Sequence, residues 1–168
     1  MKAPVRPRYD ETMTTLPPDD HGGQSQCHLL IVEDDMVQCG EMASFLGRSG
    51  LTVQMAYTGA SALHQAAKYR PRVALLDFHL PDMTGVELAK ELRALLPGIA
   101  FIMMSGEVEG LTDKTLQEIG IAVFVNKPVP LGPLRQAVLK LVLSPAAGRA
   151  AKSDEKSWFS TGLGGRRT

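Results

Sequence analysis

The sequence has few cysteines, with only Cys27 and Cys39 in 168 residues. Neither has a partner cysteine or histidines at the spacing of a zinc site, and two cysteines cannot form the framework of a disulfide-rich domain. We therefore expect two reduced thiols that pack as small hydrophobic side chains.

Net charge and long apolar runs are also absent. Eighteen basic residues balance eighteen acidic ones, so no overall field favours nucleic acid or an anionic membrane surface. No apolar run approaches the roughly 18 residues of a membrane span, and no apolar N-terminal stretch resembles a secretion signal. We expect a cytoplasmic protein that binds neither nucleic acid nor membranes.

Composition divides the chain into three parts. Residues 1–26 carry four prolines and little periodic hydrophobicity, which is typical of a disordered extension. Residues 145–168 are rich in small and charged residues, with Trp158 and Phe159 among their few large apolar groups, and we expect a flexible tail. Residues 27–144 remain as one folded domain.

Five short apolar runs alternate with segments of helical periodicity. The runs are 28–32, 51–56, 73–77, 99–105 and 121–126. The helical segments are 36–48, 60–68, 84–96, a short stretch around Leu116 and Ile119, and a stretch from about Leu134 to Val142. This alternation predicts an α/β fold, with a doubly wound five-stranded parallel sheet covered by helices on both faces.

Two of the predicted helices carry sequence signals for their buried faces. The first has apolar residues at helical spacing, namely Met36, Cys39, Ala43 and Leu46. In the third, Thr84 and Glu87 form a capping-box pattern. They precede a predicted buried stripe of Leu88, Leu92, Leu95 and Leu96.

Polar residues follow four of the five predicted strands. Glu33, Asp34 and Asp35 come after the first, and Asp77 ends the third. Because parallel strands share one carboxyl edge, these side chains converge there with those from the fourth and fifth strands, Ser105 and Lys127.

Clustered carboxylates repel one another, and a hard cation such as Mg²⁺ relieves that repulsion. A carboxylate beside such a metal can attack phosphorus. The metal, Lys127 and the Ser105 hydroxyl could then share the charge of a bound phosphoryl group.

Each of these groups alone has an ordinary structural explanation. Acidic residues after a strand often cap the next helix, Ser105 before Gly106 is common in turns, and Lys127 could simply be exposed. Their joint occurrence at four strand ends of one sheet favours a functional site.

Four stretches together resemble the receiver domain of two-component response regulators, over residues 27–143. They are "LLIVEDD", "LLDFHLPDMTG", "MMSGE" and "FVNKP". The resemblance implies a flavodoxin-like sheet with strand order 2-1-3-4-5. It also implies a domain that accepts a phosphoryl group on itself from a sensor histidine kinase or phosphotransfer protein, and then switches a binding face for an unknown downstream protein. Such a domain is not an enzyme that turns over an external substrate.

The resemblance also assigns roles at the carboxyl edge. Asp77 is similar to the phosphorylated aspartate and is a metal ligand, Asp34 is similar to the direct Mg²⁺ ligand, and Glu33 acts mainly through water. The main-chain carbonyl of His79 matches the third protein ligand, and Asp35 caps the first helix.

Three further roles follow from the same resemblance. Ser105 is similar to the switch hydroxyl, Phe124 to the switch aromatic residue and Lys127 to the phosphoryl-binding lysine. The peptide bond between Lys127 and Pro128 is expected to be cis, against the usual preference for trans.

The sequence leaves other interpretations open. The chain could be a receiver-like scaffold that receives no phosphate. A haloacid-dehalogenase-like phosphatase expects its nucleophile after the first strand and a second Asp two positions later, whereas Asp77 follows the third strand and has His79 there. A flavodoxin-like FMN carrier would need a phosphate loop where "EDD" instead repels phosphate. DNA-binding receivers often have an acidic pair before the switch aromatic residue and a following output domain, and we expect neither here.

Overall fold

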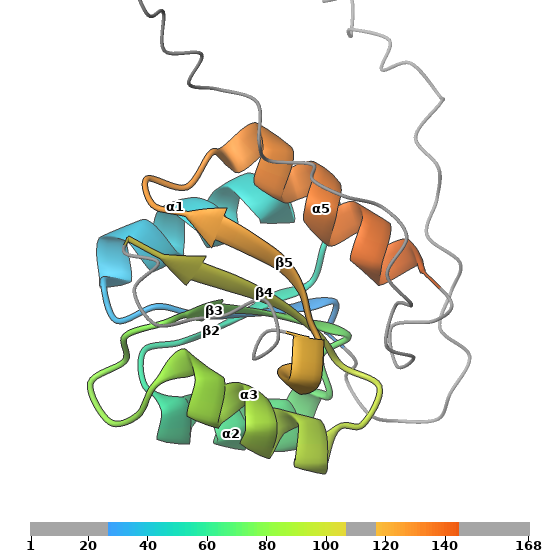
Figure 1. Ribbon diagram of the computed structural model, residues 1–168. Helices are drawn as coiled ribbons and strands as arrows, with labels where there is room; N and C mark the ends of the chain where they lie inside the picture. Colours follow the sequence, from blue (N-terminus) through green and yellow to red (C-terminus); the bar gives the residue numbers. More distant parts are fainter. Residues whose placement is uncertain (1–26, 107–116, 145–168) are drawn as a thin grey trace, which may run out of the picture.

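Five parallel strands form one sheet in the order β2-β1-β3-β4-β5, as predicted (Figure 1). The computed structural model describes residues 27–106 and 117–144. The strands are β1 (Leu29–Val32), β2 (Val53–Ala56), β3 (Val73–Asp77), β4 (Ala100–Ser105) and β5 (Ile121–Asn126). The helices are α1 (Met36–Gly47), α2 (Gly59–Tyr69), α3 (Gly85–Leu95) and α5 (Leu131–Leu143).

The helices cover both faces of the sheet, with α1 and α5 on one side and α2 and α3 on the other (Figure 1). Alternate residues of each central strand point to opposite faces. In β1, Leu29 and Ile31 join the core under α1 and α5, whereas Leu30 and Val32 join the core under α2 and α3. All residues of β1, β3 and β4 are buried, which explains their continuous apolar runs. The predicted flavodoxin-like α/β fold is confirmed.

The local signals at helix starts are also confirmed. The Asp35 carboxylate accepts hydrogen bonds from the main-chain N–H groups of Val37 and Gln38 at 2.9 and 3.1 Å and caps α1. Thr84 and Glu87 form the complete capping box of α3. Of the short helix predicted around Leu116 and Ile119, residues 117–119 are helical and Leu116 lies outside the described residues.

Two residues predicted as core are exposed, namely Met36 at 65% and Leu95 at 40%. Met36 lies in the first turn of α1, and periodicity predicts the face of a residue but not whether a neighbour covers that end of the helix. In α3, Ala89 is buried instead, which rotates the buried stripe away from Leu95.

Both cysteines are buried and free, as predicted. Burial raises the pKa of the Cys27 thiol to about 12 and that of Cys39 to about 11, so both are poor nucleophiles at neutral pH. Across residues 27–106 and 117–144, no helix combines the length and apolar character that a bilayer span requires. The predicted N-terminal extension and C-terminal tail lie outside the described residues.

Candidate functional site at the carboxyl edge of the sheet

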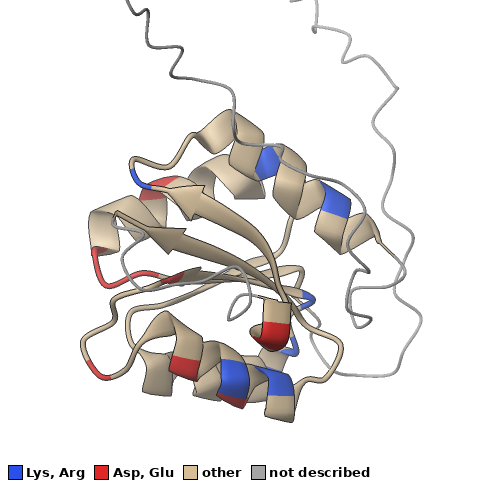
Figure 2. Cartoon of the chain, in the orientation of Figure 1, with Lys and Arg blue, Asp and Glu red and all other residues tan. Residues whose placement is uncertain are grey.

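The polar residues that follow the strands do meet at the carboxyl edge of the sheet. Asp77 is the last residue of β3 and pairs in register with Met104, the neighbour of Ser105 at the end of β4. Glu33 directly follows β1, and Lys127 directly follows β5. Figure 2 shows acidic residues in the segment between β1 and α1, at the edge toward which the strand arrows point.

Lys127 joins two of the carboxylates. Its ammonium Nζ donates to Glu33 Oε2 at 2.8 Å and to Asp77 Oδ2 at 3.0 Å. Glu33 is 1% exposed and Asp77 is 5% exposed, so both carboxylates are almost removed from water. A cation shared by two buried carboxylates offsets part of their repulsion and of their desolvation.

Burial and the neighbouring charges shift the pKa values of Glu33 and Lys127. The pKa of Glu33 is raised to about 7, mainly by burial and also by the nearby charge of Asp77, against the opposing effect of Lys127. For Lys127, burial lowers the pKa, but the hydrogen bonds to Glu33 and Asp77 and their charges outweigh burial and raise it overall. Two buried carboxyl groups thus share one ammonium group.

The carboxylates are placed to hold a metal ion. Glu33, Asp34 and Asp77 each offer an oxygen, and these oxygens lie within 4.8 Å of one another. Asp34 is exposed while the other two are buried, so the group is open to solvent on one side. A hard oxygen-ligand set with room for water and a phosphate oxygen fits Mg²⁺.

The loop between β3 and α3 is folded back on itself beside Asp77. The main-chain N–H of His79 lies 3.4 Å from Asp77 Oδ1, and His79 bridges to Thr84 across the loop. Gly85 packs so closely on the Asp77 carbonyl that a side chain would collide with it. The His79 side chain is exposed, so its main chain is the part that the loop holds near the site.

The remaining predicted residues occupy the fourth and fifth strands. Ser105 is fully buried, and its carbonyl accepts from the Lys127 main-chain N–H at 2.9 Å. Phe124 is partly buried, pairs with Met103 and packs on the core under α2 and α3. The bond between Lys127 and Pro128 is cis, as predicted.

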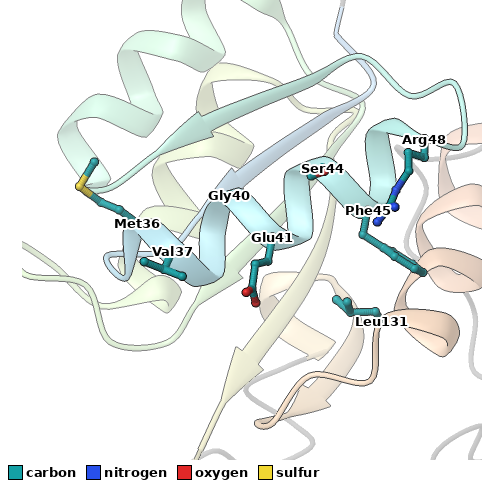
Figure 3. A pocket seen from close by; sticks show the side chains of 8 residues that line it. All are labelled: Met36, Val37, Gly40, Glu41, Ser44, Phe45, Arg48 and Leu131. Carbon is teal, nitrogen blue, oxygen red and sulfur yellow. The ribbon is translucent and has the colours of Figure 1, made fainter.

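A pocket that runs along α1 and reaches Leu131 at the start of α5 was missed from the sequence (Figure 3). Val37 is 72% exposed and Met36 65%, which makes them the most exposed large apolar residues in the described part of the chain. Both follow directly after the acidic segment. The lining residues are Met36, Val37, Gly40, Glu41, Ser44, Phe45, Arg48 and Leu131.

The sequence analysis brings Glu33 and Lys127 to one edge, but it did not predict that they pair directly, nor the contact of Asp82 with α2. Glu33 pairs directly with Lys127, although 94 residues separate them. Asp82 in the loop after β3 bonds to the start of α2. Both depend on the tertiary arrangement, for which a single sequence carries no periodic or spacing signal.

Curated proteins with similar sequences include transcriptional regulators. The chain is 31% identical over 121 residues to the transcriptional activator protein ExaE of Pseudomonas putida, covering 70% of this chain and 56% of that protein. It is 32% identical over 98 residues to the transcriptional regulatory protein CreB of Escherichia coli, covering 58% and 43%. The chain thus spans about half the length of these relatives.

Solved structures of receiver domains share the fold of this chain. A CheY-like response regulator receiver domain protein from Methanospirillum hungatei superposes with a TM-score of 0.65 at 28% identity, covering 70% of this chain and 94% of that one. The chemotaxis protein CheY4 of Vibrio cholerae shares the fold with a TM-score of 0.63 at 24% identity, covering 69% and 98%.

The family model of the response regulator receiver domain matches residues 29–139, which include all the site residues described above. Strand order, carboxylate cluster and paired lysine agree with that match. The chain therefore belongs to the response regulator receiver domain family.

Proposed function

We propose that this protein is a phosphorylation-controlled binding switch of the cytoplasm, in which residues 27–144 form the receiver and Asp77 accepts a phosphoryl group from a histidine kinase or phosphotransfer protein. The observation that carries the proposal is the Lys127 ammonium, 3.0 Å from Asp77 and 2.8 Å from Glu33. A buried carboxylate beside a fixed cation suits a nucleophile that must later carry a dianionic group.

Asp77, Lys127 and Ser105 would each have a separate role in the phosphoryl transfer. An Asp77 oxygen forms the new P–O bond while the P–N bond of a phosphohistidine breaks, and the released imidazole nitrogen keeps the bonding electron pair. The Lys127 ammonium then pairs with one phosphoryl oxygen, and the Ser105 hydroxyl donates a hydrogen bond to another.

Glu33, Asp34, Asp77 and the main-chain carbonyl of His79 would hold Mg²⁺. When bound, the ion neutralises charge on the attacking carboxylate and on the transferred group. We propose Asp34 and Asp77 as direct ligands and Glu33 as a ligand through water. Glu33 then also supplies the second partner of Lys127.

We further propose that the side chains of Ser105 and Phe124 change position when Asp77 is phosphorylated. A hydroxyl drawn toward the phosphoryl group leaves space beside β4, and Phe124, which is partly buried, can move into it. The phosphate shifts a population between two existing states by its differential stabilisation of the inward one. The surface of β5 and α5 would then change for a downstream partner.

Beryllofluoride with Mg²⁺, as a mimic of the phosphoryl group, should therefore shift the NMR resonances of the Phe124 ring and of the β5 backbone. Phe101 is the internal control, because it packs in the same core cluster but is fully buried. Its ring resonances should change little. Movement of resonances around Asp77 with none at Phe124 would contradict this reading of the output.

The phosphoryl donor must touch the carboxyl edge to bring phosphorus to Asp77. We propose that it docks on the exposed apolar start of α1, because Met36 and Val37 immediately follow the acidic segment and their side chains are exposed. Burying such side chains against a helical partner would provide binding energy next to the reacting atoms.

Val37→Glu should lower the rate of phosphotransfer from a partner protein about 10-fold or more, since a charge replaces an apolar contact. Labelling by acetyl phosphate should be unchanged, because a small donor needs no docking surface. A glutamate in the first turn of α1 also suits the helix dipole, so folding is retained. Ala67→Glu on α2, across the sheet, is the matched control and should transfer normally. Equal loss with both donors would refute docking at this face.

A further inference from the structure

The N-terminus of α2 has an acceptor for each of its free main-chain N–H groups, and two of these acceptors come from outside the helix. The N–H of Thr58 donates to Ser61 Oγ at 3.2 Å, and the N–H of Ser61 donates to Thr58 Oγ1 at 3.1 Å. The N–H groups of Gly59 and Ala60 donate to the two oxygens of Asp82, at 2.8 and 2.9 Å. Local residues thus satisfy half of the helix start, and Asp82 satisfies the rest.

Asp82 belongs to the loop between β3 and α3, more than 20 residues away in sequence. That loop is closed at its base, because the N–H of Gly85 donates to the Phe78 carbonyl at 2.8 Å. A turn shapes its tip, because the N–H of Leu80 donates to the Met83 carbonyl at 3.2 Å. Asp82 lies in that turn, so its carboxylate ties the tip of the loop to α2.

Packing supports the same contact. Met83 lies so close over Gly59 that a side chain at Gly59 would collide with the Met83 thioether. The missing side chain at Gly59 therefore leaves room for the Met83 side chain of the loop against the helix start. A carboxylate is the favoured group at this position, since the N-terminus of a helix carries partial positive charge, and the two hydrogen bonds lower the pKa of Asp82.

We propose that Asp82 is a positioning residue for the phosphorylation site: by tying the loop to α2 it holds the main chain at His79 beside Asp77, in the place needed to bind Mg²⁺. The inference rests on the proposed function for its biological meaning. Asp82 acts through the loop, because it contacts Gly59 and Ala60 directly and is not part of the carboxylate cluster. If Asp82 served only to cap α2 or to stabilise the domain, its loss would not specifically weaken Mg²⁺ binding.

The test compares Asp82→Ala with Ser61→Ala in the full chain. Ser61→Ala removes the acceptor of the Thr58 N–H, one of the two local bonds at the same helix start, and leaves the loop contact in place. For Asp82→Ala we expect Mg²⁺ affinity, measured by NMR titration with the metal alone, to fall about 10-fold, as it does for residues that orient metal ligands. In metal-free protein, hydrogen exchange at Leu80 and Gly85 should accelerate about 10-fold or more.

Ser61→Ala should keep both quantities within about twofold of wild type, and Asp82→Asn, which keeps one acceptor oxygen, should lie between wild type and Asp82→Ala. Equal Mg²⁺ affinity in wild type and Asp82→Ala overturns the inference, as do equal losses in Asp82→Ala and Ser61→Ala. Wild-type protein without Mg²⁺ binding overturns it as well. Failure of the proposed function is seen separately, as Mg²⁺ binding by a wild-type protein whose Asp77 takes no phosphate.

Discussion

Asp77→Asn should reduce phosphoryl incorporation by at least about 100-fold, because an amide is a far weaker nucleophile than a carboxylate. The measurement is intact mass after incubation with acetyl phosphate and Mg²⁺, where wild type gains one phosphoryl group. Asn keeps the size of Asp and can still accept a hydrogen bond from Lys127, so the fold at the end of β3 is preserved.

Asp35→Asn is the matched control at the same edge. Its carboxylate caps α1 and lies outside the proposed metal ligands, and Asn is an equally good helix cap. This variant should label as wild type does. Excess chelator should abolish labelling of wild type, since the transfer depends on the metal. Labelling of Asp77→Asn at the wild-type rate, or full labelling in chelator, would refute the phosphoacceptor assignment.

Glu33→Gln should stabilise the metal-free protein at pH 8. The folded-state pKa of Glu33 is about 7, above the ordinary value of 4.5, so the folded state binds the proton more tightly than the unfolded state. The contribution of Glu33 to stability is then largest below about pH 4.5 and falls as pH rises to about 7, by about 1.4 kcal/mol per pH unit and about 3 kcal/mol in all. Lys127 adds no slope in this range, because its pKa is raised above 10.5.

Glutamine carries no proton that titrates there, so the variant should lose this slope. Urea denaturation in chelator at pH 5 and pH 8 measures it, with Glu87→Gln as the control. The Glu87 pKa is lowered by its bonds to Thr84, so that variant loses stability at both pH values and keeps the slope. A wild-type free energy of unfolding that is equal at pH 5 and pH 8 would refute the prediction.

The sheet and the carboxyl edge were predictable from the sequence because both depend on local patterns. Continuous apolar runs indicate strands buried on both faces, and a parallel sheet then brings the residues after β1, β3, β4 and β5 to one edge. The capping box at Thr84 and Glu87 is likewise complete within four residues. The cis bond before Pro128 followed from the family resemblance alone.

The features that the sequence did not predict depend on which residues pack together in three dimensions. Met36 fits the helical stripe that contains the buried Cys39, yet its own side chain is 65% exposed, so the prediction that it is a core residue is wrong. The composition of "LPDMTG" is typical of a turn, but its contact with α2 requires knowledge of where that helix starts. The direct pairing of Glu33 with Lys127 likewise depends on how far each side chain reaches across the edge.

The ion pairs of Lys127 span 94 residues to Glu33 and 50 to Asp77, so they join the first strand to the last. Contacts that distant in sequence form only when the loops between them have closed. A nascent chain still lacking β5, or a receiver whose last strand has locally detached, has Asp77 but not the cation beside it. If Asp77 is the phosphoacceptor that we propose, such chains would draw little phosphate from the donor, and signal input would be confined to molecules that have completed their fold.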